Sequence, residues 1–262
     1  MKLKSLSLAL ATTALVTLSL PALAQDKTGT NMNTEAAGEP GGAATLSMAH
    51  ELYALGVASG DALTVLTAAK LAATVDLKDG GEIKLETKGD ELADEVAATK
   101  EEPADAAQMF AMAATLAGDD EALKGIIADA EAENARGRIG GAVRWKSKLP
   151  RGQTDTWEVP FYGNSYAEVA IIGDGDSNLD MMITDENGNV MCYDVSPSDQ
   201  VYCDFVPAWD GYFYVTVALL HKWSDGEGSP IPGQTYPTTS VMGVPRAVKP
   251  FRTATRTWNS AT

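Results

Sequence analysis

The feature that most constrains the fold is residues 166–219, where short apolar-alternating runs are separated by turns rich in Asp, Gly and Asn. Strands are expected at residues 155–162, 166–172, 179–183, 190–193, 201–205 and 211–219. Strands of this length and spacing are typical of antiparallel sandwiches and barrels. The best candidate for a last strand is residues 236–241, in a segment rich in Gly, Pro and Ser. We therefore predict a jelly-roll-like antiparallel β-sandwich over residues 154–245.

The chain contains two cysteines, and both fall within this region. Cys192 and Cys203 lie on the fourth and fifth expected strands, on either side of a turn rich in Pro, Ser and Asp. Neighbouring antiparallel strands would bring the two side chains within bridging range. An even cysteine count in an exported protein favours a disulfide, so we predict a Cys192–Cys203 bridge.

The first 24 residues have the three parts of an export signal. Lys2 and Lys4 supply the positive start, residues 6–20 the apolar run, and Ala22-Leu23-Ala24 the small-residue cleavage site. The mature protein is expected to begin at Gln25 and to be periplasmic or secreted. No transmembrane segment is expected after removal of the signal.

The chain divides into two parts by charge and composition. Its net charge is −16, and most of the acidic excess lies before residue 136, whereas all five tryptophans lie after it. A strongly acidic chain repels phosphate backbones, so a nucleic-acid partner is disfavoured. The asymmetry predicts an α+β chain with an N-terminal helical unit and a C-terminal β unit.

The N-terminal part is rich in alanine and leucine at helical spacing. Apolar residues from Leu46 to Val57 and from Leu63 to Ala73 predict a helical hairpin, with Asp61 as an N-cap. A weakly similar pattern recurs near Met109 and Asp120. The recurrence is either a degenerate helical repeat or a coincidence within a plain helical bundle.

These patterns give the following expected layout: a signal peptide at 1–24, a flexible leader at 25–44, an acidic helical region at 45–135, a basic connector at 136–153, the β-sandwich at 154–245 and a basic tail at 246–262. Within the helical region, residues 76–105 are charged and poor in apolar residues. They predict a mobile insertion or a charged hairpin around Gly80-Gly81. The connector is expected to dock on the acidic part, and an anionic-surface site is the alternative.

Three motifs stand out in the β region: Asn178-Leu179-Asp180 followed by Met181-Met182-Ile183, the turn Asp185-Glu186-Asn187-Gly188-Asn189, and Pro207 followed by Asp210-Gly211-Tyr212-Phe213-Tyr214-Val215. Their order resembles that of the bacterial pre-peptidase C-terminal domain. This resemblance extends over about residues 154–220. The resemblance implies a small β-sandwich that serves as a non-catalytic accessory module of secreted enzymes.

Acidic and amide side chains cluster at the centre of the β region, at Asp174, Asp176, Asn178, Asp180 and Asp185. Hard cations prefer several oxygen ligands at close spacing, so a calcium site is one interpretation. A solvated turn, in which Asp and Asn bond their own backbone, is the favoured one. No cofactor is required in either case.

The tryptophans suggest a second kind of site. Trp157, Trp209 and Trp223 could form an aromatic ligand-binding face, although at least two of the tryptophans are expected to pack in the core or at a sheet edge. Catalytic signatures are missing: His50-Glu51 lacks a second histidine four residues on, and there is no G-x-S-x-G or P-loop sequence.

The sequence thus favours an exported, non-catalytic binding module of the cell envelope, with an envelope protein or a glycan as partner. The alternative is a secreted hydrolase, or an accessory subunit of one, with a site between the two parts.

Overall fold

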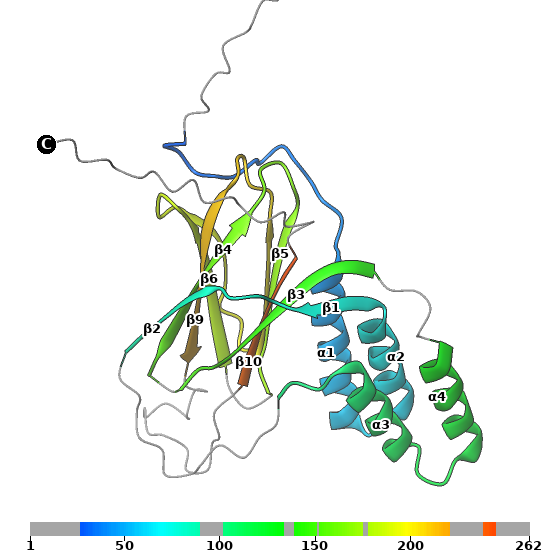
Figure 1. Ribbon diagram of the computed structural model, residues 1–262. Helices are drawn as coiled ribbons and strands as arrows, with labels where there is room; N and C mark the ends of the chain where they lie inside the picture. Colours follow the sequence, from blue (N-terminus) through cyan, green and yellow to red (C-terminus); the bar gives the residue numbers. More distant parts are fainter. Residues whose placement is uncertain are drawn as a thin grey trace, which may run out of the picture.

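The computed structural model describes residues 27–89, 102–133, 139–150, 152–174, 178–220 and 238–244. It combines four helices with a two-layer β-sandwich, as the sequence predicted (Figure 1). The expected signal peptide and basic tail lie outside these residues.

Within the described residues, ten strands form two five-stranded sheets. One sheet, here sheet A, has the order β1 (Val75–Asp79), β3 (Ile139–Lys148), β10 (Thr238–Val244), β5 (Ala167–Ile172) and β8 (Gln200–Phe205). The other, sheet B, has the order β2 (Lys84–Lys88), β4 (Thr154–Phe161), β9 (Gly211–Leu220), β6 (Asn178–Asp185) and β7 (Val190–Asp194). The eight strands β3 to β10 follow the strand order of a jelly roll, and all their pairings are antiparallel.

The core between the sheets is apolar because strand residues alternate between the two faces. β4 shows this directly, since every second residue from Asp155 to Phe161 is buried. Three rings of this core, Phe161, Phe205 and Phe213, contact one another with centroids 5.1 to 5.6 Å apart. Such edge-on and tilted ring contacts add to the energy of burial itself.

The helices form a layer against the outer face of sheet A (Figure 1). They are α1 (Gly42–Ser59), α2 (Ala62–Ala73), α3 (Ala106–Leu116) and α4 (Glu121–Glu133). Ala142, Ala170 and Ile172 of the sheet share one apolar core with the helices. All six residues of β5 are buried, because this strand has the helices on one face and sheet B on the other.

The first helical hairpin has the expected cap. Asp61 accepts a hydrogen bond from the Leu63 N–H at 2.9 Å and starts α2. Gly60 ends α1 with φ of 68°, a conformation that glycine adopts without a steric cost. At Gly56 the helices approach so closely that a Cβ atom would lie 2.6 Å from a Val65 methyl group.

Three parts of the predicted layout are wrong. The segment 76–105 does not form a hairpin around Gly80-Gly81, because β1 joins sheet A and β2 joins sheet B. Much of the basic connector 136–153 is strand β3. The described part of the leader 25–44 is anchored by Asn31, whose side chain is 0% exposed. The sandwich therefore extends well beyond residues 154–245.

The basic residues of β3 do pair with the acidic part, as their charge predicted. Arg144 pairs with Asp79 at 2.8 Å, and Lys146 pairs with Glu102. Both pairs are partly exposed, so each contributes less than about 1 kcal/mol.

Candidate ligand-binding cleft

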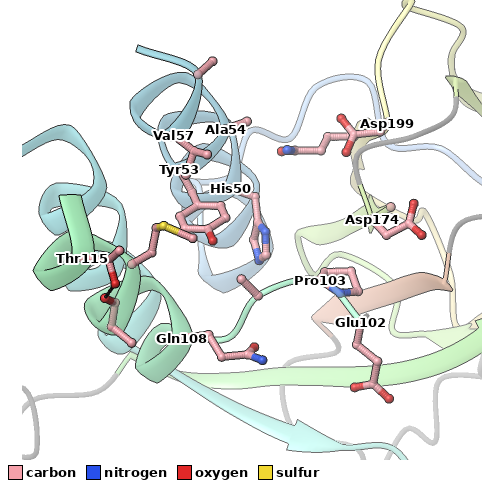
Figure 2. A pocket seen from close by; sticks show the side chains of 16 residues that line it. His50, Tyr53, Ala54, Val57, Glu102, Pro103, Gln108, Thr115, Asp174 and Asp199 are labelled. Atoms are coloured by element: carbon pink, nitrogen blue, oxygen red, sulfur yellow. Dashed lines mark hydrogen bonds between the residues drawn. The ribbon is translucent and has the colours of Figure 1, made fainter. Parts of the chain in front are cut away.

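A cleft of about 800 Å³ lies where the helical layer meets one end of the sandwich (Figure 2). It is lined by three parts of the chain that are distant in sequence: α1, the segment 102–115 that includes α3, and the loops at the ends of β5 and β8. The volume falls in the range of pockets that hold small ligands.

The helical wall of the cleft is mainly apolar. On α1, His50, Tyr53, Ala54 and Val57 lie on one face, because residues three or four apart share a helix face. On α3, residues Gln108, Ala111, Met112 and Thr115 face the cleft with the same spacing. Most side chains of this wall are therefore small and apolar, and a few polar side chains lie between them.

The opposite wall comes from the sandwich and is polar. Figure 2 shows Asp174 and Asp199 across the cleft from the α1 side chains. Their loops are joined by a hydrogen bond from the Gly173 N–H to the Asp199 carbonyl at 2.8 Å. Glu102 adds a third carboxylate to the lining. Of these carboxylates, Glu102 is paired with Lys146.

His50 is a buried polar residue of this cleft. It is 6% exposed and forms no hydrogen bond with the rest of the described chain. Burial lowers the pKa of His50 to about 4, so the imidazole is neutral near pH 7. A neutral imidazole has one donor and one acceptor nitrogen.

Gln200 is a second buried polar group on the lining. It is 9% exposed, and its Oε1 atom has no hydrogen-bond partner within the described chain. A buried acceptor without a partner costs about 1–3 kcal/mol. The sandwich side of the cleft therefore holds an acceptor that a ligand could satisfy.

The predicted calcium ligands do not converge on one point. Asn178 and Asp185 lie at opposite ends of β6, which places them roughly 23 Å apart at 3.3 Å per residue. A single ion therefore cannot bind all five predicted residues. In the described chain no group of three His, Cys, Asp or Glu residues is arranged for a metal, and Asp176 lies outside it.

Asp185 has a different role, which its turn sequence predicted in part. Its carboxylate is 0% exposed and accepts hydrogen bonds from the N–H groups of Asn31, Asn187 and Asn189 at 2.8 to 2.9 Å. Burial alone would raise the pKa of Asp185, but these bonds and the Asn189 side chain hold it below its ordinary value. Asp185 therefore anchors the N-terminal segment to the β6–β7 turn.

Asp174 and Asp180 lie in separate environments. Asp174 lines the cleft, whereas Asp180 lies on β6. Burial, together with the negative charge of Asp194, raises the pKa of Asp180. Calcium binding by this part of the chain stays a prediction, but not with all five residues as ligands.

Two of the three predicted ligand-face tryptophans are buried. Trp157 packs in the core between the sheets, and the Trp209 Nε1–H donates to Glu186 at 2.7 Å. Both follow the expectation of core packing, so the prediction of a ligand face is wrong for these two residues. Trp223 lies outside the described residues. The exposed aromatic side chains of the described β region are Tyr193 and Tyr212.

The Cys192–Cys203 disulfide is present, with Cα atoms 6.0 Å apart. The predicted pairing is confirmed, but the two strands are not hydrogen-bonded neighbours. Cys192 is on β7 of sheet B and Cys203 is on β8 of sheet A. The bridge therefore ties the edges of the two sheets together.

The comparison with protein-family models and the comparison with curated proteins both give no match. The resemblance to the pre-peptidase C-terminal domain therefore stays a prediction. Among the described helices, none has the length and hydropathy that a membrane span requires.

Proposed function

We propose that the protein is an exported, non-catalytic binding module of the bacterial cell envelope, and that its ligand occupies the cleft between the helices and the sandwich. The observation that carries the proposal is a cleft of about 800 Å³ whose lining includes two polar residues. Gln200 has a buried Oε1 atom without a hydrogen-bond partner in the described chain, and His50 is 6% exposed and forms no hydrogen bond there. A ligand would fill the apolar wall and satisfy both groups.

Binding is favoured over catalysis because of the state of His50. General-base catalysis needs a histidine whose pKa lies near the working pH and that contacts a nucleophile or an orienting carboxylate. The pKa of His50 is about 4, and in the described chain its imidazole bonds to neither kind of group. Export is supported by the signal-like N-terminus and by the disulfide.

A hydrolase, or an accessory subunit of one, is the second candidate. It is favoured by Asp174 and Asp199, which lie on the same wall of the cleft (Figure 2). Paired carboxylates are the usual acid and base of glycoside hydrolysis.

The test uses a variant that fills the cleft. Ala54→Trp places a large ring on the cleft wall, whereas Leu55→Trp places the same ring on a residue of α1 that is 61% exposed and does not line the cleft. The protein without its signal peptide is immobilised and incubated with an envelope extract of the bacterium that encodes it. Material retained by the original protein and by Leu55→Trp should be lost with Ala54→Trp.

Retention that Ala54→Trp leaves unchanged would refute the cleft as the binding site. Asp174→Asn and Asp199→Asn separate the two candidates. A binding module should release retained material unmodified, whereas a hydrolase should cleave it and should lose this cleavage in one of the two variants.

A further inference from the structure

We infer that the cleft binds an uncharged peptide segment, whose apolar side chains pack on the helical wall and whose main chain bonds to His50 and Gln200. The inference rests on the proposed function, since it names the chemical class of the ligand for the same cleft. It follows from the apolar wall, from the two polar side chains with unused hydrogen-bonding groups, and from the interactions that the carboxylates of the lining already make.

The apolar wall is the first argument. Tyr53, Ala54 and Val57 of α1 face the cleft, and Ala111 and Met112 of α3 continue the same wall (Figure 2). Val57 is 39% exposed although its side chain is entirely apolar. Covering such surface with apolar side chains of a ligand removes it from water and favours binding. A ligand that carries only polar groups would gain nothing from this wall.

The second argument comes from His50 on the helical wall and Gln200 on the sandwich wall. His50 is 6% exposed and forms no hydrogen bond within the described chain, where the buried Gln200 Oε1 atom also has no partner. Neutral imidazole offers one donor and one acceptor, and Oε1 is an acceptor. A peptide main chain carries an N–H and a C=O group at almost every residue. One segment can therefore bond to both walls.

Two other uncharged ligands fit the lining less well. An acyl chain has its polar groups at one end, so it does not supply hydrogen bonds to both walls. A glycan would place hydroxyl groups on the alanine and valine side chains, where they would lose hydrogen bonds to water without replacing them. Tyr53 is the only Phe, Tyr or Trp among the described lining residues, so the lining offers a sugar a single ring.

The carboxylates of the lining indicate that the bound segment is uncharged. Glu102 is paired with Lys146, and Asp174 and Asp199 each interact with other groups of the chain. A ligand cation is therefore not needed to balance them. A charged side chain that is buried in a cleft costs free energy unless it gains a partner of its own. Lysine or glutamate within the bound segment should therefore weaken binding.

The experiment measures the fluorescence anisotropy of labelled peptides that have an uncharged fluorophore at the N-terminus and an amide at the C-terminus. The reference peptide is Ala-Val-Leu-Val-Ala, and two others carry lysine or glutamate in place of leucine. The leucine peptide should bind about tenfold more tightly than either charged peptide, because only the charged side chains must lose water on burial.

Variants of His50 test the contact with the main chain. His50→Phe keeps a ring and removes both nitrogens, so it should weaken the leucine peptide about tenfold. His50→Gln keeps a donor and an acceptor and should retain most of the affinity, which a loss of ring packing alone would not explain. Gln200→Leu removes the buried acceptor at similar volume and should also weaken binding. The matched control Leu55→Trp changes an exposed residue of α1 outside the lining and should bind like the original protein.

The outcomes separate this inference from the proposed function. Equal or tighter binding of a charged peptide, lost in Ala54→Trp, would overturn the uncharged ligand and leave a cleft-binding module. Binding of the leucine peptide that neither His50→Phe nor Gln200→Leu weakens would overturn the main-chain contact.

No binding of the leucine peptide would overturn the peptide as ligand. A labelled monoacylglycerol or a trimer of N-acetylglucosamine that binds instead, and is lost in Ala54→Trp, would then give the class of ligand for the same cleft. Peptide binding that Ala54→Trp does not change would refute the cleft itself.

Discussion

Lowering the pH from 7 to 5 should destabilise the protein by about 2 kcal/mol through His50 alone. The folded pKa of His50 is about 4, whereas its unfolded value is 6.5. Because the folded pKa is lowered, the unfolded chain binds the proton more tightly. The stability contributed by neutral His50 is therefore complete above pH 6.5 and is lost as the pH falls from 6.5 towards 4.

The magnitude follows from proton linkage at the two pH values. At pH 5 the imidazole is almost fully protonated in the unfolded chain and mostly neutral in the folded one, so proton binding lowers the free energy of unfolding by about 2 kcal/mol. At pH 7 the imidazole is mostly neutral in both states, and this effect is close to zero. Most carboxylates still stay ionised at pH 5, so their titration enters only at lower pH. Tyr53, Glu102, Asp174 and Asp199 line the same cleft, but burial is the dominant cause of the shift.

The assay is urea unfolding at pH 7, 6 and 5 for the original protein and for His50→Gln, which keeps a donor and an acceptor but does not titrate. The original protein should lose about 2 kcal/mol more than the variant between pH 7 and 5. All other titratable groups are common to both proteins, so the difference between them reports on His50. An identical loss in the two proteins, or an NMR titration of the His50 ring with a midpoint near 6.5, would refute the reasoning.

Three further predictions concern the sandwich. The double variant Cys192→Ser, Cys203→Ser should lose about 2–3 kcal/mol in urea unfolding, because the bridge restricts the unfolded chain; unchanged stability would contradict this. Asn31→Ala should lower the free energy of unfolding by about 2 kcal/mol, because the Asn31 side chain donates to the Trp209 carbonyl and accepts from the Trp209 N–H. Asn33→Ala removes an exposed hydrogen bond to Asn164 and should lower it by less than half as much. Asp185→Asn should lower the melting temperature equally with and without millimolar calcium, and a calcium-dependent gain that this variant abolishes would show that Asp185 is a ligand.

Strands β4 to β9 could be predicted from the sequence because turns rich in Asp, Gly and Asn separate clear apolar runs. β2 could not, since all five of its residues are exposed and it shows no alternation of buried and exposed positions. β3 has the composition of a basic connector, because Arg144, Lys146 and Lys148 dominate it. These three residues are two positions apart, which is the spacing of side chains on one face of a strand. Their charge nevertheless gives the segment the composition of a connector.

The N-terminal anchor could not be predicted for a different reason. The composition of residues 25–44 is that of a flexible segment, and Asn31 has no local partner that would mark it. Its hydrogen bonds reach Asp185 and Trp209, which are 154 and 178 residues away in sequence. Such contacts depend on the tertiary fold and leave no periodic pattern.

The cleft could not be predicted, because its walls come from segments that the sequence does not relate to one another. In the sequence His50 stands only in an incomplete zinc-protease pattern, and no motif marks Gln200. A histidine on the same helix face as Tyr53, Ala54 and Val57 was the available signal. That signal does not distinguish a cleft from a packed core.

The geometry of the cleft depends on how α1 docks on sheet A, and Glu168 fixes that docking. Glu168 is 2% exposed; its Oε1 atom accepts from the Gly41 N–H at 2.8 Å and from the Tyr202 hydroxyl at 2.9 Å. Burial, with Tyr166 and Glu168 nearby, raises the pKa of Tyr202, which keeps its hydroxyl protonated as a donor. A carboxylate at the start of a helix is also stabilised by the helix dipole.

Strand β5 contributes to one wall of the cleft and helix α1 to the other. β5 carries Glu168 near its start and leads into Gly173 and Asp174 at the cleft, while α1 starts beside Gly41 and brings His50 to the cleft. This buried contact and the apolar core that the helices share with sheet A together position α1 relative to β5, and the cleft opens further along that pair. The helices and the sandwich pack as one unit for this reason, although their compositions suggest two.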